Sequence, residues 1–212
     1  MAITGIPTAV FTMVAKKHVG IRMGLLQERC TKNLLDMLTV GTLALMSYAL
    51  LYEAGNLVKL PDKCIGFYNF CLWNDTAGEL QCLDNTHLEA IGISLPEMAL
   101  ARLCVYTCLV ITPFHLLYVL TVNCTGQREG WKTIRIISLI KLIILSGGLG
   151  MFLLQTSRWI HPSDFTGGFL ALLGTQALLL LQILTATVYL SWAKHTHMCQ
   201  SHSTEEALLT KI

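Results

Sequence analysis

Residues 66–82 read Gly66-Phe-Tyr-Asn-Phe-Cys-Leu-Trp-Asn-Asp-Thr-Ala-Gly-Glu-Leu-Gln-Cys82 and indicate on which side of a membrane this part of the chain lies. Two cysteines in this aromatic-rich stretch, Cys71 and Cys82, can form a disulfide in an oxidising compartment. The stretch also contains Asn74-Asp75-Thr76, an acceptor for N-glycosylation that is used only in the secretory lumen. We therefore expect this stretch to lie outside the cytosol.

Long apolar runs flank this stretch on both sides. The chain of 212 residues is 53% hydrophobic and 13% charged, whereas soluble domains have about 25% charged residues. Crossing the hydrocarbon core of a bilayer takes about 20 mostly apolar residues. Four runs meet that length: 34–52, 98–122, 133–157 and 168–192. The composition predicts an all-α membrane protein, a four-transmembrane-helix bundle that fills residues 34–192.

The basic residues predict the orientation of this bundle. Ten Lys and Arg residues lie in residues 1–33, in the loop after the second span together with the first turn of the third span, and in residues 193–212, against three in the other two loops. Cytosolic segments carry the excess of Lys and Arg. We therefore expect cytosolic tails at 1–33 and 193–212, an extracellular loop at 53–97, and a protein of the secretory pathway or plasma membrane. A second acceptor sequence at Asn123 would then be silent.

The extracellular loop is expected to form a small lobe pinned by a disulfide. Residues 64–73 are rich in aromatic residues, which favours extended structure. A Cys71–Cys82 bridge would contribute roughly 3 kcal/mol by the loop-entropy argument. The loop also contains Cys64, and three cysteines allow three single pairings. Cys64 is therefore a free thiol, an intermolecular partner or an alternative partner within the loop.

Three of the charged residues inside the predicted spans can be given a structural role. Asp36 is in the first turn of the first span, where a carboxylate favours the helix N-terminus. Arg102 lies near the outer end of the second span, so we expect its side chain to reach the extracellular face and pair with Glu53 or Glu97. Lys141 leans toward the cytosolic side, where snorkelling or an ion pair with Asp36 is expected. We interpret all three as structural charges.

Small residues in the third span predict a helix-packing face. Ser146, Gly147 and Gly150 fall close together in the sequence, and small residues let helix backbones approach in lipid. Gly174 in the fourth span is the expected partner surface.

The loop and second span resemble the claudin-like group of four-span membrane proteins. The shared features are Leu72-Trp73, the spaced cysteines and Arg102 near the outer end of the second span, although Cys71 precedes the tryptophan here. The chain is more similar to the vertebrate transmembrane protein 140 family at residues 48–57, 66–74, 80–82, 100–102, 147–150 and 168–172. This resemblance implies a multi-pass membrane protein without an established enzymatic activity.

Function is predicted only in outline. We expect a non-enzymatic protein whose first extracellular loop and helix faces contact lipid and other membrane proteins. The alternative is a small channel or transporter subunit, suggested by Arg102, His115, Lys141, Gln176 and Gln182, which the sequence spreads through the bilayer. Thr210-Lys211-Ile212 fit a C-terminal ligand for a PDZ groove. We expect no cofactor, no metal site and no catalytic residues. We also expect no nucleic-acid binding, since the distribution of the basic residues follows the membrane topology.

Overall fold

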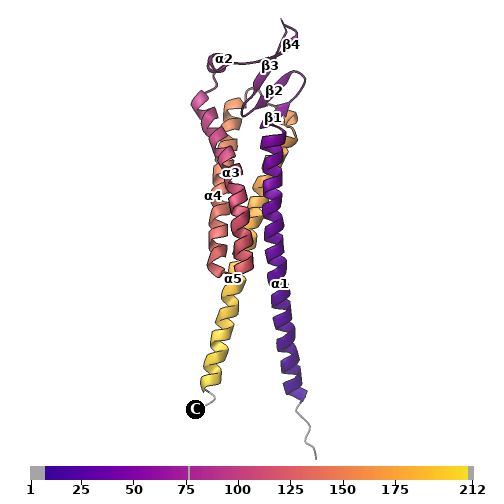
Figure 1. Cartoon of the computed structure of the whole chain (residues 1–212), viewed down its shortest axis with the longest axis vertical. Helices are drawn as coiled ribbons and strands as arrows, with labels where there is room; N and C mark the ends of the chain where they lie inside the picture. Colours follow the sequence, from indigo (N-terminus) through magenta and orange to yellow (C-terminus); the bar gives the residue numbers. More distant parts are fainter. Residues whose placement is uncertain (1–7, 76, 210–212) are drawn as a thin grey trace, which may run out of the picture.

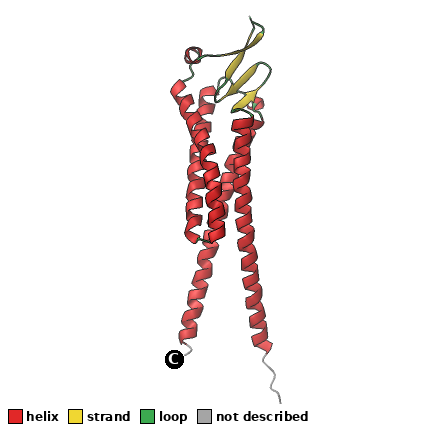
Figure 2. Ribbon diagram, viewed as in Figure 1, coloured by secondary structure: helices red, strands yellow, loops and turns green. Residues whose placement is uncertain are grey.

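Four long helices dominate the computed structural model, which describes residues 8–75 and 77–209 and places side chains from residue 27 to residue 193 except at 76, 85 and 128 (Figures 1 and 2). They are α1 Thr8–Ser47, α3 Leu95–Thr125, α4 Arg128–Thr156 and α5 Gly167–Leu209. A π-helical segment, Tyr48–Tyr52, continues α1, and the short helix α2 spans Asn85–Ala90. Each long helix contains all or most of one of the apolar runs. An apolar run favours a helix because the backbone N–H and C=O groups then hydrogen-bond to one another within the same segment.

The four long helices pack as a ring in chain order. α1 contacts α3 and α5, and α4 contacts α3 and α5. α1 and α5 extend beyond the other two at the end away from the sheet (Figure 1). Segments long and apolar enough to cross a membrane are Gln27–Tyr52, Leu95–Thr125, Glu129–Thr156 and Gly167–Ala193. These segments contain the predicted spans and are longer than them by up to seven residues at one end, except that the third predicted span passes the end of α4 by one residue, Ser157.

A four-stranded antiparallel sheet lies at the other end of the bundle (Figure 2). Its strands are β1 Asn56–Lys59, β2 Lys63–Gly66, β3 Phe70–Asn74 and β4 Glu79–Cys82, paired in that order. The aromatic-rich segment predicted as extended therefore forms most of β2 and β3 and the turn between them. We call residues 53–94, which hold the sheet and α2, the lobe.

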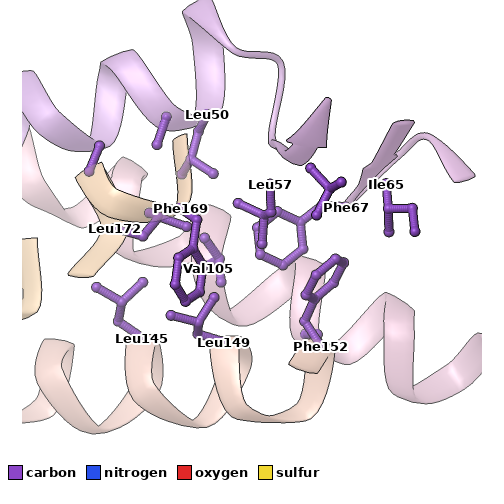
Figure 3. Packing of buried hydrophobic residues seen from close by; sticks show 14 of the residues in the cluster. Leu50, Leu57, Ile65, Phe67, Val105, Leu145, Leu149, Phe152, Phe169 and Leu172 are labelled. Atoms are coloured by element: carbon purple, nitrogen blue, oxygen red, sulfur yellow. The ribbon is translucent and has the colours of Figure 1, made fainter. Parts of the chain in front are cut away.

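One face of the sheet packs on the helices. Ile65, Phe67 and Phe70 lie in the same buried cluster as Phe152 of α4 and Phe169 of α5 (Figure 3). Because these side chains share one core with the bundle, the lobe is part of the bundle's own packing.

The interior of the bundle contains two apolar cores with a polar layer between them. The larger core lies at the lobe end and includes Met46, Cys108, Leu145 and Leu179. The smaller core, at the other end, consists of Leu35, Val119, Val122, Trp131, Ile134, Ala186 and Tyr189. Between them every long helix contributes buried polar side chains: Thr39, Thr42, Thr112, His115, Ser138, Lys141 and Gln182.

Candidate functional site

The outermost part of the lobe is the hairpin of β3 and β4. The predicted Cys71–Cys82 disulfide is formed and joins directly paired residues of the two strands. Trp73 pairs with Leu80 on the same face of the hairpin, and both side chains are exposed, at 47% and 38%. Directly paired side chains in antiparallel strands contact one another. The hairpin therefore presents a rigid apolar pair, which we call the Trp73–Leu80 face.

Asn74, the predicted glycosylation residue, lies on the opposite face of this hairpin. It is adjacent to Trp73 in β3, and successive residues of a strand point to opposite faces. Its Nδ2 donates to Gln81 Oε1 at 2.7 Å, and its Oδ1 accepts from the backbone N–H of Ala77 at 3.3 Å. Thr76, which completes the acceptor sequence, lies outside the described residues. A glycan on Asn74 would leave the Trp73–Leu80 face uncovered.

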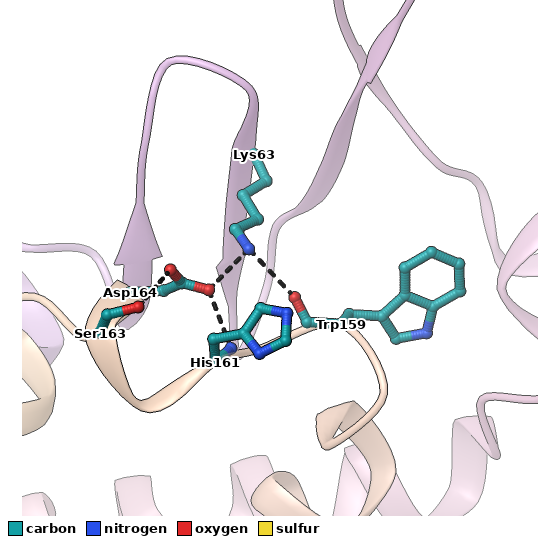
Figure 4. A network of polar contacts seen from close by, with 5 residues as sticks. All are labelled: Lys63, Trp159, His161, Ser163 and Asp164. Carbon is teal, nitrogen blue, oxygen red and sulfur yellow. Dashed lines mark hydrogen bonds and ion pairs between the residues drawn. The ribbon is translucent and has the colours of Figure 1, made fainter.

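An ion pair fixes the lobe to the segment between α4 and α5 (Figure 4). Lys63 Nζ donates to Asp164 Oδ2 at 2.6 Å and to the carbonyl of Trp159 at 3.3 Å. The backbone N–H of His161 donates to Asp164 Oδ2 at 2.8 Å. The hydrogen bond from Lys63 holds the pKa of the Asp164 carboxyl below its ordinary value, and the His161 N–H and the Ser163 hydroxyl act in the same direction.

Arg102 connects α3 to the turn between β2 and β3. Its Nε donates to the carbonyl of Phe67 at 2.8 Å, and its guanidinium carbon lies 4.1 Å from the centroid of the Tyr68 ring. Among the described residues it forms an ion pair with neither Glu53 nor Glu97; Tyr48 donates to the Glu53 carboxylate and Gln155 donates to the Glu97 carboxylate. The side chain therefore reaches toward the lobe, and a carbonyl and an aromatic ring take the place of the predicted acidic partners.

A cavity of about 230 Å³ lies beside Arg102. Its wall combines the β2–β3 turn with apolar residues of α2 and α3, among them Leu88 and Met98. No acidic residue lines it in the described part of the chain. This is a half-open pocket with one cation at its edge.

The polar layer brings together residues that the sequence seemed to scatter. Gln182 Nε2 donates to Thr42 Oγ1 at 2.9 Å, and Ser138 Oγ donates to Gln182 Oε1 at 3.1 Å, which links three helices. His115 and Lys141 belong to the same layer, and no described residue hydrogen-bonds their side-chain nitrogens. The expectation of scattered polar groups is wrong for these residues. It holds for Arg102, at the lobe end, and for the half-buried Gln176.

A sequence signal for this layer exists. Three of the helices carry two buried polar residues at a spacing of three: Thr39 and Thr42, Thr112 and His115, Ser138 and Lys141. Residues at this spacing share a helix face. Recurrence of the pair in three spans identifies the layer, whereas each residue alone does not.

Asp36 does not meet Lys141. Its Oδ1 accepts a hydrogen bond from Asn123 Nδ2 of α3 at 2.7 Å. Gln182 hydrogen-bonds both Thr42 and Ser138, so these two residues lie at the same height in the bundle. Asp36 precedes Thr42 in α1 and Lys141 follows Ser138 in α4, and both helices run in the same direction. With a rise of about 1.5 Å per residue, Asp36 and Lys141 are therefore roughly 13 Å apart along the bundle axis. The predicted ion pair is therefore wrong, and so is snorkelling, because the Lys141 side chain is 1% exposed.

The helix-packing face is displaced from the predicted residues. A Cβ on Gly148 would lie 2.8 Å from Cys104 Cβ and 3.0 Å from the carbonyl of Ala101, so this glycine permits the contact of α4 with α3. Ser146 and Gly147 are exposed, and Gly147 and Gly150 would meet nothing within 4 Å. Gly174 packs against Leu45 of α1 instead of α4. The prediction erred because rotation of α4 about its axis turns Gly148 inward.

Two further expectations concern other parts of the chain. The Thr210-Lys211-Ile212 ligand for a PDZ groove lies outside the described residues. Among those that are described, no group of three His, Cys, Asp or Glu residues has the arrangement of a metal site.

The comparison with known families covers most of the chain. Residues 28–204 match the TM140 protein family, from the start of the first apolar run to beyond the last. That match includes the lobe, the Arg102 contacts and the polar layer. The chain therefore belongs to the TM140 protein family.

Proposed function

We propose that this chain is a non-enzymatic integral membrane protein that crosses the bilayer four times and binds another membrane protein through the Trp73–Leu80 face. The observation that carries the proposal is the disulfide-pinned hairpin with two large apolar side chains exposed side by side. Aromatic residues held in rigid positions are frequent anchors of protein interfaces. Lipid contact is expected along the exposed apolar faces of the four helices.

The orientation belongs to the same proposal. The lobe faces the secretory lumen or cell exterior, and both tails face the cytosol. Three observations support it: the basic residues, the formed disulfide, and the position of Asn123 inside α3, where Nδ2 is bonded to Asp36. An asparagine in that position is a poor glycosylation acceptor, whereas Asn74 lies on an exposed hairpin.

Glycosidase-sensitive gel mobility tests the orientation. We expect the wild-type chain to carry a glycan that is lost in Asn74→Gln and retained in Asn123→Gln. A glycan lost only in Asn123→Gln would invert the topology and place the cysteine-containing loop in the reducing cytosol. That result would overturn the proposal, since the hairpin would then lack both its disulfide and its extracellular partner.

Proximity labelling and crosslinking in cells test the docking face. We expect the full chain to recover a defined set of membrane-protein neighbours that is depleted severalfold by Trp73→Ala combined with Leu80→Ala. Glu79→Ala is the matched control, because Glu79 is exposed in the same hairpin but pairs with Asn74 on the other face. Neighbours that survive the double substitution, or no reproducible neighbour at all, would contradict a role for this face.

A second candidate is a small channel or transporter subunit, which the polar layer favours. Buried ionisable residues in membrane helices are costly and often mark transport pathways. Here His115 and Lys141 lie in one layer without a hydrogen-bonding partner among the described residues. Flux measurements in proteoliposomes with Lys141→Met and His115→Phe test it. Unchanged flux in correctly folded variants would remove this candidate.

A further inference from the structure

One row of residues crosses all four strands of the sheet. The register pairs Lys59 of β1 with Cys64 of β2, Cys64 with Cys71 of β3, and Cys71 with Cys82 of β4. Directly paired residues project from the same face of a sheet. The core residues Ile65 and Phe70 occupy the face toward the bundle, so this row lies on the opposite face. We call Cys64, Cys71 and Cys82 the cysteine row.

The spacing of strands decides which disulfides the cysteine row allows. Directly opposed residues in antiparallel strands have Cα atoms about 4.5–5.5 Å apart, within the range of disulfides. Cys64 can therefore bridge to Cys71 without a change of register. Cys64 and Cys82 are two strand spacings apart, roughly 9.6 Å, which exceeds the limit of about 7 Å. Two of the three pairings fit this backbone, and both use Cys71.

We propose that the Cys64 thiol exchanges with the Cys71–Cys82 disulfide, so that the lobe has two disulfide isomers. The Cys64 thiolate attacks Cys71 Sγ, a Cys64–Cys71 bond forms, and the Cys71–Cys82 bond breaks with Cys82 as the leaving thiolate. One proton leaves Cys64 and one is gained by Cys82. A thiol and a disulfide exist before and after the step, so no oxidant or reductant is consumed.

The strand order gives this exchange its geometry. Displacement at sulfur proceeds with the attacking and leaving sulfurs on opposite sides of the attacked one. β3 lies between β2 and β4, so Cys64 and Cys82 flank Cys71 from opposite sides. The attacking thiol is free and half-buried. Exchange therefore requires local movement of three adjacent strands and no rearrangement of the lobe.

Lys59 is positioned to promote the attack. Only the thiolate is nucleophilic, and a neighbouring ammonium favours that form. Burial raises the pKa of the Cys64 thiol, and the charge of Lys59 opposes this rise. On the other side of Cys64 is Cys71, which does not titrate while it is in the disulfide. Exchange should therefore be slow near neutral pH and accelerate about tenfold per pH unit below the thiol pKa.

The product differs from the starting isomer at the edge of the sheet. All four residues of β4 are exposed, and among the strands that the structure describes β4 pairs with β3 alone. Exchange moves the covalent link to β2 and β3 and leaves the Cys82 thiol on this exposed edge strand. That thiol can form a mixed disulfide with a cysteine of another protein. The exchange itself needs no partner, so it can be tested independently of the proposed docking function.

Disulfide mapping of the full-length protein in detergent micelles tests the exchange. Chymotrypsin is suitable because Phe67, Phe70 and Trp73 separate the three cysteines into different peptides. Samples incubated between about pH 7 and pH 9, where the thiolate fraction increases, are quenched by alkylation over minutes to hours. We expect the Cys64–Cys71 peptide to increase together with alkylated Cys82, faster at higher pH.

Four substitutions make the test specific. Cys82→Ser should form the Cys64–Cys71 bridge almost completely, and Cys64→Ser should abolish alkylation of Cys82. Lys59→Gln should slow exchange severalfold, whereas Lys132→Gln in α4, a matched loss of an exposed lysine, should leave it unchanged.

Two results would overturn the proposal. One is alkylation of both Cys64 and Cys71 in Cys82→Ser. The other is Cys82 alkylation that persists in Cys64→Ser, which would show opening of the disulfide without Cys64. The second measurement needs only variants that keep the native disulfide, so it remains decisive if Cys82→Ser does not fold.

Discussion

Lys141 brings an amine into the middle of the bundle, where its side chain is buried and no described residue accepts a hydrogen bond from Nζ. Its backbone carbonyl accepts a hydrogen bond from Cys108 Sγ at 3.6 Å, and His115 lies in the same layer. Burial of a polar group without a partner is unfavourable. A residue kept at such a cost is a candidate for function in a membrane protein.

We predict that Lys141→Met raises the stability of the isolated protein. Methionine has a similar length and needs no hydrogen bond, so the variant should gain roughly 1–3 kcal/mol in free energy of unfolding. Thermal unfolding in detergent micelles, followed by helical circular dichroism, measures this. Leu139→Met, at an exposed position of α4, is the control for an added methionine and should leave the free energy of unfolding unchanged. A less stable Lys141→Met variant would mean that the amine has a stabilising partner.

Asp164 is the residue whose ionisation should control attachment of the lobe. Its folded pKa is below its ordinary value, so ionisation stabilises the folded state above about pH 5, where the unfolded carboxyl is also charged. That contribution is lost as the pH falls through the folded pKa. We predict that the wild-type melting temperature decreases below about pH 4.5 more steeply than that of Asp164→Asn. Parallel decreases in the two proteins would contradict this assignment.

Among the elements, α4 approaches α3 closely at two glycines, Gly130 near the connecting loop and Gly148 nearer the lobe. Gly148→Ala would place Cβ against Cys104 Cβ and Val105 Cγ2, at 2.8 and 3.0 Å. We predict a loss of roughly 1–3 kcal/mol, typical of overpacking. Gly147→Ala is the matched control, because its Cβ would meet nothing within 4 Å and alanine favours the helix by up to about 1 kcal/mol. Equal effects of the two substitutions on chemical unfolding would contradict this packing.

The helices could be predicted from sequence and the lobe only in part. Apolar runs of membrane length identify the four long helices, because a segment in lipid must form all its backbone hydrogen bonds within itself. The individual strands lack a clear alternation: Phe70 and Cys71 are both buried although they point to opposite faces. Contacts between distant helices, such as Gln182 with Thr42, depend on helix rotation and level, which a single run does not specify.

At the scale of the whole molecule, the lobe and the bundle share hydrogen bonds as well as a core. Thr166 donates its backbone N–H to the carbonyl of Leu57 at 3.0 Å, and Gly55 donates its backbone N–H to the carbonyl of Ala49, in the π-helical continuation of α1, at 3.1 Å. Together with the Lys63–Asp164 and Arg102–Phe67 contacts, these connect the lobe to α3, to α1 and to the segment before α5. We expect the lobe to unfold together with the lobe end of the bundle.

Phe67 is the residue that tests this cooperativity. It is fully buried at the junction, with ring centroids 4.9 Å from Phe152 of α4 and 6.5 Å from Tyr106 of α3. Phe67→Ala should cost roughly 3–5 kcal/mol, because it removes a buried ring and leaves a cavity between the lobe and two helices. Hydrogen exchange should then increase in β2 and also in the lobe-side turns of α3 and α4. Trp73→Ala, a comparable aromatic truncation at an exposed position of the hairpin, should leave exchange in those helices unchanged. Increased exchange confined to the strands in Phe67→Ala would instead mean that the lobe folds as an independent unit on a bundle that is stable without it.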